Sequence, residues 1–510
     1  MAKRSEVKRP WPFRGWMVVA LSLLLSAASG QERNSRTALP SQDDTATSPS
    51  TPEVAVSRFM LTTVTDTTAV FTWETNRPTE TIIRYGKHGE RLDRIARPMP
   101  PGGSGQAGGT PVASSSRRFE HCELRGLRPG TRYDYACQVE HDATTGQANG
   151  QFTTLIPPPG EELFSFATMT DTHVGQQIVA RLSLRGKLIS PGTRWPEPNR
   201  PFWRLAVGAA IDEINARGAA FTIIKGDLTD GSTANEFPQA RQLFDRLTRP
   251  YRVVHGNHDA AAPFLQTFGL AKPWYSFNHQ DIHLVILDTE PMVNDKDPVL
   301  DAELNWLARD LRDHADRWTF VLLHRPILPK LERASGEALT EELLQLGSGL
   351  LGKIYGSGAA HTIDLATGKT PSVSPNAARK LAPLLRAHGR IAGVFAGHLH
   401  RNYVGYWPEE TGNLPYVETA STKEYPCGYA ITRVFTGGYM QSYHTPRDPQ
   451  CLHWSAMTQD AYARLGLHSK AGDLAERNFV VSFDELCLSP RPPSGDSSRP
   501  GQSEENLRQP

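Results

Sequence analysis

The sequence predicts an α/β domain preceded by a small all-β domain. Beyond about residue 163, five short apolar runs suit buried strands. In the same region, four leucines from Leu300 to Leu311 recur at helical spacing and predict a helix with a core-facing stripe. Further upstream, alternating runs such as 69–73 and 81–85 are broken by turn residues, which is typical of an all-β unit.

Each of the five apolar runs ends at a short polar signature. The runs are 164–169, 221–224, 251–254, 320–323 and 391–395, and the signatures that follow them are Asp171-Thr-His173, Gly226-Asp227, Gly256-Asn257-His258-Asp259, His324 and Gly397-His398-Leu-His400. Open α/β sheets place their sites at the carboxyl ends of strands, so we expect these polar groups to gather there. Carboxylates, an amide oxygen and imidazoles suit borderline ions such as Mn, Fe or Zn.

The order and wording of these signatures resemble the calcineurin-like metallophosphoesterase superfamily over about residues 163 to 435. The resemblance implies a four-layer α/β/β/α sandwich and a centre of two metal ions. It assigns Asp171, His173 and His400 to one metal, Asn257, His324 and His398 to the other, and the carboxylate of Asp227 as a bridge between them. Two cations so bridged lie about 3.5 to 4 Å apart and clamp the attacking and leaving oxygens of an in-line displacement.

By the same resemblance, His258 lies beside the metals without ligating them. There it would protonate the leaving alkoxide or steady the phosphate. Its neighbour Asp259 is expected to orient the ring, because a carboxylate bonded to one imidazole nitrogen fixes the tautomer and favours the charged form. Arg325, directly after His324, either touches the substrate phosphate or is solvated.

Several histidines match no signature, and packing or exposure is the preferred interpretation of each. They are His255, His279, His283, His314, His361, His388, His444 and His453. His361 stays open as a functional residue because it sits in a long insertion, 328–375, that could fold over the site. This insertion and the segment 176–201 exceed ordinary connections, so substrate choice is expected to reside in them.

Two positions depart from the related purple acid phosphatases. Those enzymes carry a tyrosinate ligand three residues after the bridging aspartate, where this chain has Asp230, and they carry glycine in place of His173. The first metal should therefore have an imidazole instead of a phenolate, without the charge-transfer colour. The Asp-x-His signature looks like the broader group that includes phosphodiesterases.

The resemblance implies a metal-dependent phosphoric ester hydrolase that acts by attack of a metal-bound hydroxide, with two metal ions as cofactors and a phosphoester as partner. A phosphodiesterase acting on a cyclic nucleotide or another diester is one alternative. A non-catalytic surface binding module on a phosphatase scaffold is another, although all seven ligand positions keep chemically competent residues. Substrate identity, the native metal pair and the oligomeric state are left open.

Length and charge bound the remaining possibilities. A chain of 510 residues exceeds one ordinary core and should divide into two or three domains. The formal net charge of +1 gives no electrostatic case for a nucleic-acid or membrane-surface partner, so neither is expected.

The amino terminus predicts export to the periplasm, the medium or the cell surface. Basic residues from Lys3 to Arg14 precede an apolar stretch, 16–28, and the small residues Ala28-Ser-Gly30 follow. About thirteen apolar residues are too few for a membrane span, which needs about twenty. We therefore expect a signal peptide over residues 1–30, cleaved near Gly30, with an uncleaved anchor as the alternative.

The predicted domain order follows from these observations. It is a signal peptide (1–30), a disordered spacer (31–52), a β-sandwich (53–156), the catalytic domain (163–445), a carboxyl-terminal extension (446–487) and a disordered tail (488–510). A stiff linker, 157–160, joins the two folded domains, and a Gly/Pro/Ser-rich loop, 98–116, is expected within the first.

The string Leu127-Arg-Pro-Gly-Thr-Arg-Tyr133-Asp-Tyr135 resembles the tyrosine corner of fibronectin type III and purple-phosphatase-like amino-terminal domains. In that corner a tyrosine hydroxyl bonds back to the chain. Trp73 is the expected core aromatic. Of the five cysteines, Cys122 could pair with Cys137 and Cys427 with Cys451, and Cys487 would remain. No Cys-x-x-Cys occurs, so zinc-site spacing is absent from the sequence.

Overall fold

The computed structural model describes residues 54–98, 118–140, 142–184, 187–197, 199–294, 297–327, 372–407, 414–463 and 469–487. The predicted signal peptide and spacer, nearly all of the loop 98–116, most of the insertion 328–375 with His361, and the tail from 488 lie outside these residues.

The amino-terminal domain consists of two antiparallel sheets, as the sequence predicts. One has the order β1-β2-β5 and the other β4-β3-β6-β7. The strands are β1 (Val56–Val64), β2 (Ala69–Thr75), β3 (Thr81–Lys87), β4 (Arg94–Ala96), β5 (Arg118–Leu124), β6 (Arg132–Val139) and β7 (Asp142–Thr153). Trp73 is buried in the core and donates through Nε1 to the Thr81 hydroxyl. The Tyr133 hydroxyl accepts from the backbone N–H of Arg128 at 3.0 Å, which confirms the tyrosine corner.

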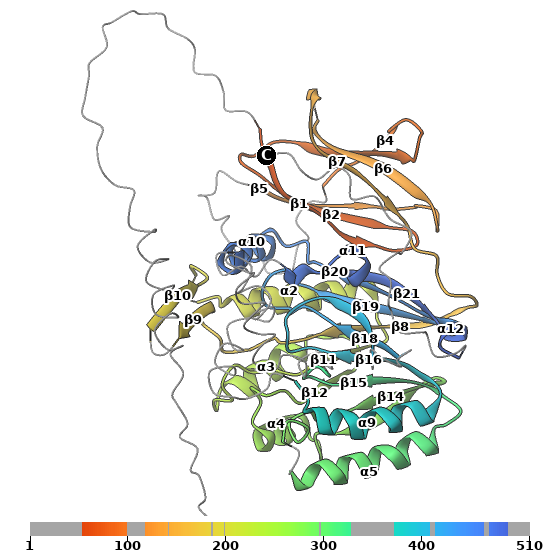
Figure 1. Cartoon of the computed structure of the whole chain (residues 1–510). Helices are drawn as coiled ribbons and strands as arrows, with labels where there is room; N and C mark the ends of the chain where they lie inside the picture. The colour runs from red at the N-terminus through yellow and green to blue at the C-terminus, as the bar shows by residue number, and fades with distance from the viewer. Residues whose placement is uncertain are drawn as a thin grey trace, which may run out of the picture. The chain divides into compact units, whose positions relative to one another are not determined.

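The predicted catalytic domain, called the catalytic body below, contains two six-stranded mixed sheets (Figure 1). The first has the order β12 (Tyr251–Val254), β11 (Phe221–Lys225), β8 (Glu162–Met169), β19 (Tyr429–Phe435), β20 (Gly438–His444) and β21 (Asn478–Ser482). The second has the order β13 (Tyr275–His279), β14 (Ile282–Ile286), β15 (Trp318–Leu322), β16 (Ile391–Ala396), β18 (Leu414–Glu418) and β17 (Tyr403–Trp407). Strands β8, β11 and β12 run parallel, as do β14, β15, β16 and β18. All five predicted apolar runs are strands.

An aromatic core joins the two sheets. Phe166 of the first sheet packs edge-on against Phe320 of the second with ring centroids 5.5 Å apart, and Phe320 packs against Tyr439 at 5.2 Å. Helices α2 (Phe202–Arg217), α3 (Glu236–Phe244) and α4 (Ala261–Phe268) cover the outer face of the first sheet. Helices α5 (Pro298–Asp313) and α9 (Pro375–His388) cover the second. The α/β/β/α order of layers is therefore confirmed.

The leucine stripe lies on α5 as predicted. Leu300, Leu304, Leu307 and Leu311 are all buried against the second sheet. The helix begins with Asp297 as its N-cap, whose side chain accepts from the Val299 N–H, and with Pro298 in its first turn. Within the insertion 176–201, strands β9 (Val179–Leu184) and β10 (Lys187–Thr193) form an antiparallel hairpin.

The carboxyl-terminal extension has its own helices and contacts both domains. It contains α10 (Pro449–Ala463), the 3₁₀ turn η2 (Ser469–Ala471), α11 (Leu474–Arg477) and α12 (Phe483–Cys487). Arg477 donates to the carbonyl oxygens of Leu61 and Thr62 on β1, and Arg58 of β1 pairs with Asp460 of α10. The extension therefore ties the β-sandwich to the catalytic body.

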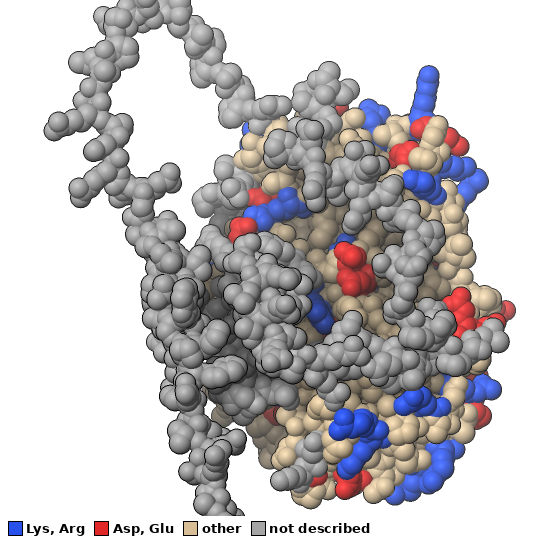
Figure 2. Space-filling model, viewed as in Figure 1, with Lys and Arg blue, Asp and Glu red and all other residues tan. Residues whose placement is uncertain are grey.

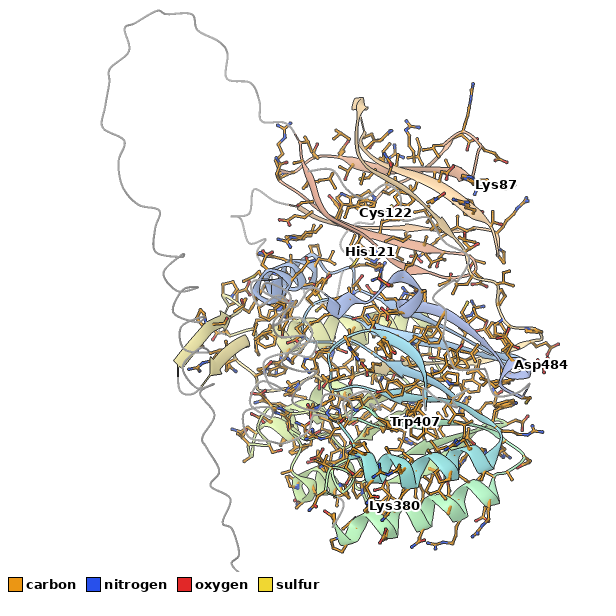
Figure 3. The ribbon with its side chains drawn as sticks, viewed as in Figure 1. Lys87, His121, Cys122, Lys380, Trp407 and Asp484 are labelled. Atoms are coloured by element: carbon orange, nitrogen blue, oxygen red, sulfur yellow. The ribbon has the colours of Figure 1, made fainter. Side chains whose placement is uncertain are left out.

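The five cysteines are free, four of them buried and Cys487 exposed. Cys122 and His121 are neighbours on β5 (Figure 3). No helix among the described residues is long and apolar enough to span a membrane. Figure 2 shows basic and acidic groups interspersed over the described surface of one face, in keeping with the net charge of +1.

Candidate metal centre

The predicted ligands lie in the loops at the carboxyl ends of β8, β11, β12, β15 and β16. Five of the seven have positive φ although none is glycine: Asp171 (52°), His173 (39°), Asp227 (49°), His398 (69°) and His400 (52°). Such conformations cost of order 1 to 3 kcal/mol each and persist only where surrounding structure imposes them. Their concentration at one place marks these loops as a functional site.

Two glycines allow the loops to approach closely. A Cβ on Gly226 would lie 2.4 Å from Nδ1 of His324, and one on Gly256 would lie 2.0 Å from the backbone N of Asp227. Only a residue without a side chain fits at these positions. The glycines of the signatures therefore serve the packing of the ligand loops.

The first group of donors contains Asp171, His173 and His400, all buried, with ligand atoms within 4.8 Å of one another. Oδ1 of Asp171 lies 3.1 Å from Nε2 of His400. Asp171 Oδ1 and His173 Nε2 are both buried, and neither makes a hydrogen bond of good geometry within the described residues. A buried polar atom without a partner is costly, and a shared cation would satisfy both atoms. The donor set therefore fits a metal ion.

The second group contains Asp227, His324 and His398, again all buried. Asn257 joins it, because its Oδ1 lies 3.0 Å from Nε2 of His324. The same nitrogen lies 3.2 Å from Nδ1 of His398 and 3.2 Å from Oδ1 of Asp227. Four donor atoms thus converge on one point, as the ligands of a borderline cation do.

Asp227 faces both groups. Its Oδ1 is the oxygen beside His324, while its Oδ2 lies 3.5 Å from Nε2 of His173 in the first group. Burial alone would raise the pKa of this carboxyl, but His324 and His258 hold the pKa well below its usual range. An ionised carboxylate with one oxygen toward each group is the arrangement that a bridging ligand requires.

Three of the predicted ligand imidazoles have a polar partner at Nδ1. Nδ1 of His324 donates to the carbonyl oxygen of Lys225 at 2.9 Å. Nδ1 of His173 lies 3.2 Å from Oδ1 of Asp230, and Nδ1 of His400 lies 2.7 Å from Oε1 of Glu424. In each case Nε2 is left for the cation, which is how metal-bound histidines are usually oriented.

The supporting roles of Asp230 and Glu424 were not predicted from the sequence. In the sequence, Asp230 is recognisable only as the residue at the position of the purple acid phosphatase tyrosinate. Its spacing of three residues from Asp227 is the one signal for its role beside His173. Glu424 lies 24 residues beyond His400 in no recognised signature, so only the folded chain brings the two together.

His258 lies beside the first group with its ring 4.6 Å from that of His173. Its Nδ1 donates to the carbonyl oxygen of Asp230 at 2.6 Å, and its backbone N–H donates to Oδ1 of Asp227. Burial lowers the pKa of His258, but Asp227 and Asp230 outweigh it and raise the pKa above its ordinary value. Bound cations would act in the opposite direction.

Asp259 differs from the prediction that it orients the His258 ring. Its carboxylate accepts from the backbone N–H groups of Leu228, Thr229 and Gly256. It therefore joins the loop after β11 to the loop after β12, and the carbonyl of Asp230 holds the His258 ring instead. The physical reason is that Asp259 closes a turn onto Gly256, with its own N–H donating to the Gly256 carbonyl, which directs its side chain away from its neighbour.

Arg325 is buried, so the solvated alternative is wrong. Its Nε donates to Glu290 at 2.6 Å, and its NH1 group lies 3.4 Å from Nε2 of His398. Arg325 therefore borders the second group of donors.

Two of the histidines that match no signature form buried pairs with carboxylates. His255 bonds to Asp288 at 3.0 Å and His283 to Asp310 at 2.8 Å. Both ring nitrogens of His283 are hydrogen-bonded, and its ring stacks on that of His314 at 3.8 Å. This arrangement supports packing, in agreement with the sequence interpretation.

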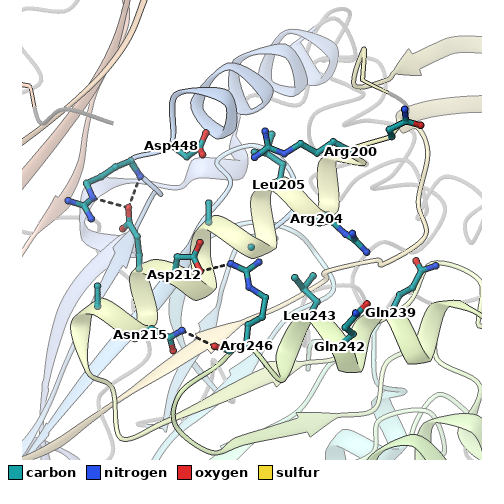
Figure 4. Close-up of a pocket in the computed structure, with 16 residues that line it drawn as sticks. Arg200, Arg204, Leu205, Asp212, Asn215, Gln239, Gln242, Leu243, Arg246 and Asp448 are labelled. Carbon is teal, nitrogen blue, oxygen red and sulfur yellow. Dashed lines mark hydrogen bonds and ion pairs between the residues drawn. The ribbon is translucent and has the colours of Figure 1, made fainter. Parts of the chain in front are cut away.

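A cavity of about 1070 Å³ lies elsewhere on the catalytic body, lined mainly by α2, α3 and the residues just before α10 (Figure 4). None of the predicted ligands lines it. Its charges are largely paired within the wall, as between Arg246 and Asp212 and between Arg447 and Glu213. The cavity is therefore separate from the metal centre.

Comparison with protein families agrees with this geometry. The family model described as calcineurin-like phosphoesterase matches residues 164–402. The chain carries a calcineurin-like metallophosphoesterase domain. The model of the purple acid phosphatase N-terminal domain matches residues 57–154, which is the β-sandwich. A domain of this family and the two buried donor groups together imply a dinuclear metal centre.

Two curated bacterial relatives are similar to parts of the metallophosphoesterase chain. The glycerophosphodiester phosphodiesterase GpdQ of Enterobacter lignolyticus is 28% identical over 116 residues, which cover 21% of this chain and 42% of the relative. The probable glycerophosphodiester phosphodiesterase GpdQ of Arcobacter nitrofigilis is 24% identical over 193 residues, or 36% of this chain and 58% of the relative. The alignments thus span less than two thirds of either relative.

Two solved structures are also similar to the metallophosphoesterase chain. A purple acid phosphatase from yellow lupin (Lupinus luteus) seeds has a TM-score of 0.38 and 13% identity, covering 86% of this chain and 76% of its own. A dimetal phosphatase from Danio rerio has a TM-score of 0.40 and 12% identity, covering 56% of this chain and 97% of its own.

Proposed function

We propose that this metallophosphoesterase hydrolyses phosphoesters with two metal ions, chosen from Mn, Fe and Zn, held by the seven predicted ligands. The observation that carries the proposal is the placement of Asp227, with one carboxylate oxygen beside His324 and the other facing His173. Asp171, His173 and His400 would hold one ion. Asn257, His324 and His398 would hold the other.

The ions and the protein have separate tasks in this proposal. Two bound cations would lower the pKa of a coordinated water and offset the charge on phosphoryl oxygens. His258 would give its proton to the leaving oxygen, because its Nδ1–H is fixed on the Asp230 carbonyl and its Nε2 is the remaining ring nitrogen. Arg325, buried beside His398 and held by Glu290, would contribute positive charge at the edge of the site.

A diester is the second candidate substrate. Two similarities favour it: both curated relatives are named as glycerophosphodiester phosphodiesterases, and His173 stands where purple acid phosphatases have glycine. The alignments are partial, so the preference between mono- and diesters is a matter for measurement.

The test is metal analysis of purified protein followed by a substrate panel. Protein reconstituted with Mn, Fe or Zn is assayed on p-nitrophenyl phosphate, bis-p-nitrophenyl phosphate and a glycerophosphodiester. We expect two metals per chain and hydrolysis of at least one class. Asp310→Asn, which alters a His–carboxylate pair outside the metal centre, serves as a matched control and should leave activity unchanged. Bound metal without hydrolysis of any substrate would favour a non-catalytic binding module.

We also propose that the protein acts after export. The basic and apolar composition of residues 1–30 supports this. Amino-terminal sequencing of protein recovered outside the cytoplasm should begin just after Gly30. An intact Met1 on that material would contradict cleavage.

A further inference from the structure

Glu424 stands at the centre of a fully buried polar network that reaches the metal centre. Its Oε1 accepts from His400 Nδ1 at 2.7 Å, from the Tyr462 hydroxyl at 2.6 Å and from Lys470 Nζ at 2.7 Å. Its Oε2 accepts from Lys423 Nζ at 2.7 Å. Every one of these side chains is buried. A buried carboxylate with four partners is rigid, because each partner would lose a bond if it moved.

Two of these partners belong to the carboxyl-terminal extension, outside the segment that matches the phosphoesterase family. Tyr462 is on α10, and Lys470 is on η2. The family match ends at residue 402, so neither partner falls within it. The extension thus completes the surroundings of a ligand that lies inside the family domain.

One face of α10 contacts the loop that carries Glu424. Cys451, Trp454, Thr458 and Tyr462 are spaced three or four residues apart and so share one face of the helix. Trp454 Nε1 donates to the Lys423 carbonyl at 2.6 Å, and the Thr458 hydroxyl accepts from the Tyr425 N–H at 3.0 Å. The loop is therefore bonded to α10 on both sides of Glu424.

The turn η2 also braces the chain just after His400. The backbone N–H of Asn402 donates to the Lys470 carbonyl at 3.0 Å, and the Asn402 side chain donates to the Ala471 carbonyl at 3.1 Å. Both the backbone that carries the ligand and the carboxylate that orients its ring thus depend on residues 449–471.

The charge state of Glu424 suits this task. Nζ of Lys423 and Nζ of Lys470 each lie 2.7 Å from one of its oxygens, so the carboxylate is paired with two buried ammonium groups. An ionised carboxylate on Nδ1–H fixes the tautomer of His400, leaves the lone pair of Nε2 for a cation and raises the basicity of the ligand.

We propose that the carboxyl-terminal extension is part of the metal centre, with Glu424, held by Tyr462 and Lys470, as the positioning residue that sets the affinity of the His400 site for its cation. This inference rests on the proposed function only in taking His400 as a ligand.

The test measures metal binding separately at the two sites. Metal-free protein is titrated with Co²⁺ in competition with a chelator, and two dissociation constants are fitted. His400→Ala identifies the constant of the first site and Asn257→Ala that of the second. We expect Glu424→Gln to weaken the first site by about 10- to 100-fold and to leave the second within about twofold. Tyr462→Phe, which keeps the ring and removes one hydrogen bond, should weaken the first site by up to about fivefold.

Asp66→Asn is the matched control, because it alters a buried carboxylate that pairs with Arg433 outside the metal centre. It should change neither constant. Equal loss at both sites in Glu424→Gln, or no loss at the first, would overturn the inference. Circular dichroism of each metal-free variant detects misfolding. If Glu424→Gln misfolds, the two dissociation constants of Tyr462→Phe test the inference. Wild-type protein that binds two cations but hydrolyses no phosphoester would refute the proposed function while leaving this inference to be judged by the binding constants.

Discussion

Oδ1 of Asp230 lies 3.2 Å from Nδ1 of His173, so the residue at the position of the purple acid phosphatase tyrosinate contacts a predicted ligand imidazole. Asp230 also holds the His258 ring through its carbonyl oxygen. Asp230, three residues after Asp227, therefore contacts both the predicted ligand His173 and the predicted acid His258.

This relationship predicts the colour of the iron form. Because an imidazole takes the place of the phenolate, iron-loaded protein should lack a strong visible phenolate band. An absorption spectrum of protein reconstituted with Fe³⁺ checks this, with the metal content measured on the same sample. A purple preparation would mean that another tyrosine, such as Tyr403 or Tyr425, reaches the metal.

Replacement of Asp227 should empty both metal positions. One carboxylate serves two cations whose mutual repulsion it offsets, so Asp227→Ala is expected to bind neither tightly and to lose activity. Metal per chain, measured after dialysis, decides the matter, with Asp66→Ala as the matched removal of a buried carboxylate elsewhere. Retention of two metals by Asp227→Ala would exclude the bridging role.

His258→Ala should separate chemistry from metal binding. The variant is expected to keep both metals and to lose roughly 10²- to 10⁴-fold in rate, the usual contribution of general acid catalysis. The loss should be greatest for alkyl phosphates, since an alkoxide needs a proton on departure and p-nitrophenolate does not. Equal impairment on both substrate types, or loss of one metal, would move His258 into phosphate binding or the ligand set.

Cys427 and Cys451 should form a disulfide on oxidation. Their sulfur atoms lie 3.4 Å apart, both buried, and join the Glu424 loop to α10. Exchange with glutathione disulfide would remove two electrons and two protons from the pair and yield two molecules of glutathione. Peptide mapping without reductant should find the cross-linked pair, and the bond should raise Tm through roughly 3 kcal/mol of stabilisation. Cys487→Ser should leave the cross-link intact, whereas Cys427→Ser should abolish it. Two unlinked peptides from oxidised wild-type protein would contradict the prediction.

Acid should destabilise the protein through His121. Burial, assisted by Arg447 and Arg217, lowers the pKa of this histidine to about 3, whereas in the unfolded chain its pKa is about 6.5. The unfolded state then binds more protons below pH 6.5, so stability is complete above that pH and falls as the pH drops toward 3. His121 contributes up to ~1.4 kcal/mol per pH unit to the slope of the unfolding free energy against pH.

Urea denaturation at several pH values measures this slope. His121→Leu should flatten the pH dependence between 6.5 and the folded pKa, whatever its effect at neutral pH. An unchanged slope in that variant would assign the acid sensitivity to other groups.

Local patterns predicted much of the fold and of the centre. Each buried strand corresponds to an apolar run in the sequence, and the buried face of α5 corresponds to leucines at helical spacing. Burial places apolar residues at the period of the element, so these elements can be predicted from the sequence. The polar signatures follow the strands directly, so the order of Asp171, Asp227, Asn257 and the later histidines can be predicted from the sequence. These features depend on neighbours in the chain.

The sequence by itself thus determined the layers of the fold and the order in which the predicted ligands follow the strands. Tertiary structure alone decided which groups hold the ligands in place: Glu424 on His400, Asp230 on His173, and the Asp230 carbonyl in place of Asp259 on His258. The physical reason is that these contacts join loops and helices far apart in the chain, and their geometry depends on how the sheets and α10 pack. Hydrogen bonds of this kind leave no periodic trace in the sequence.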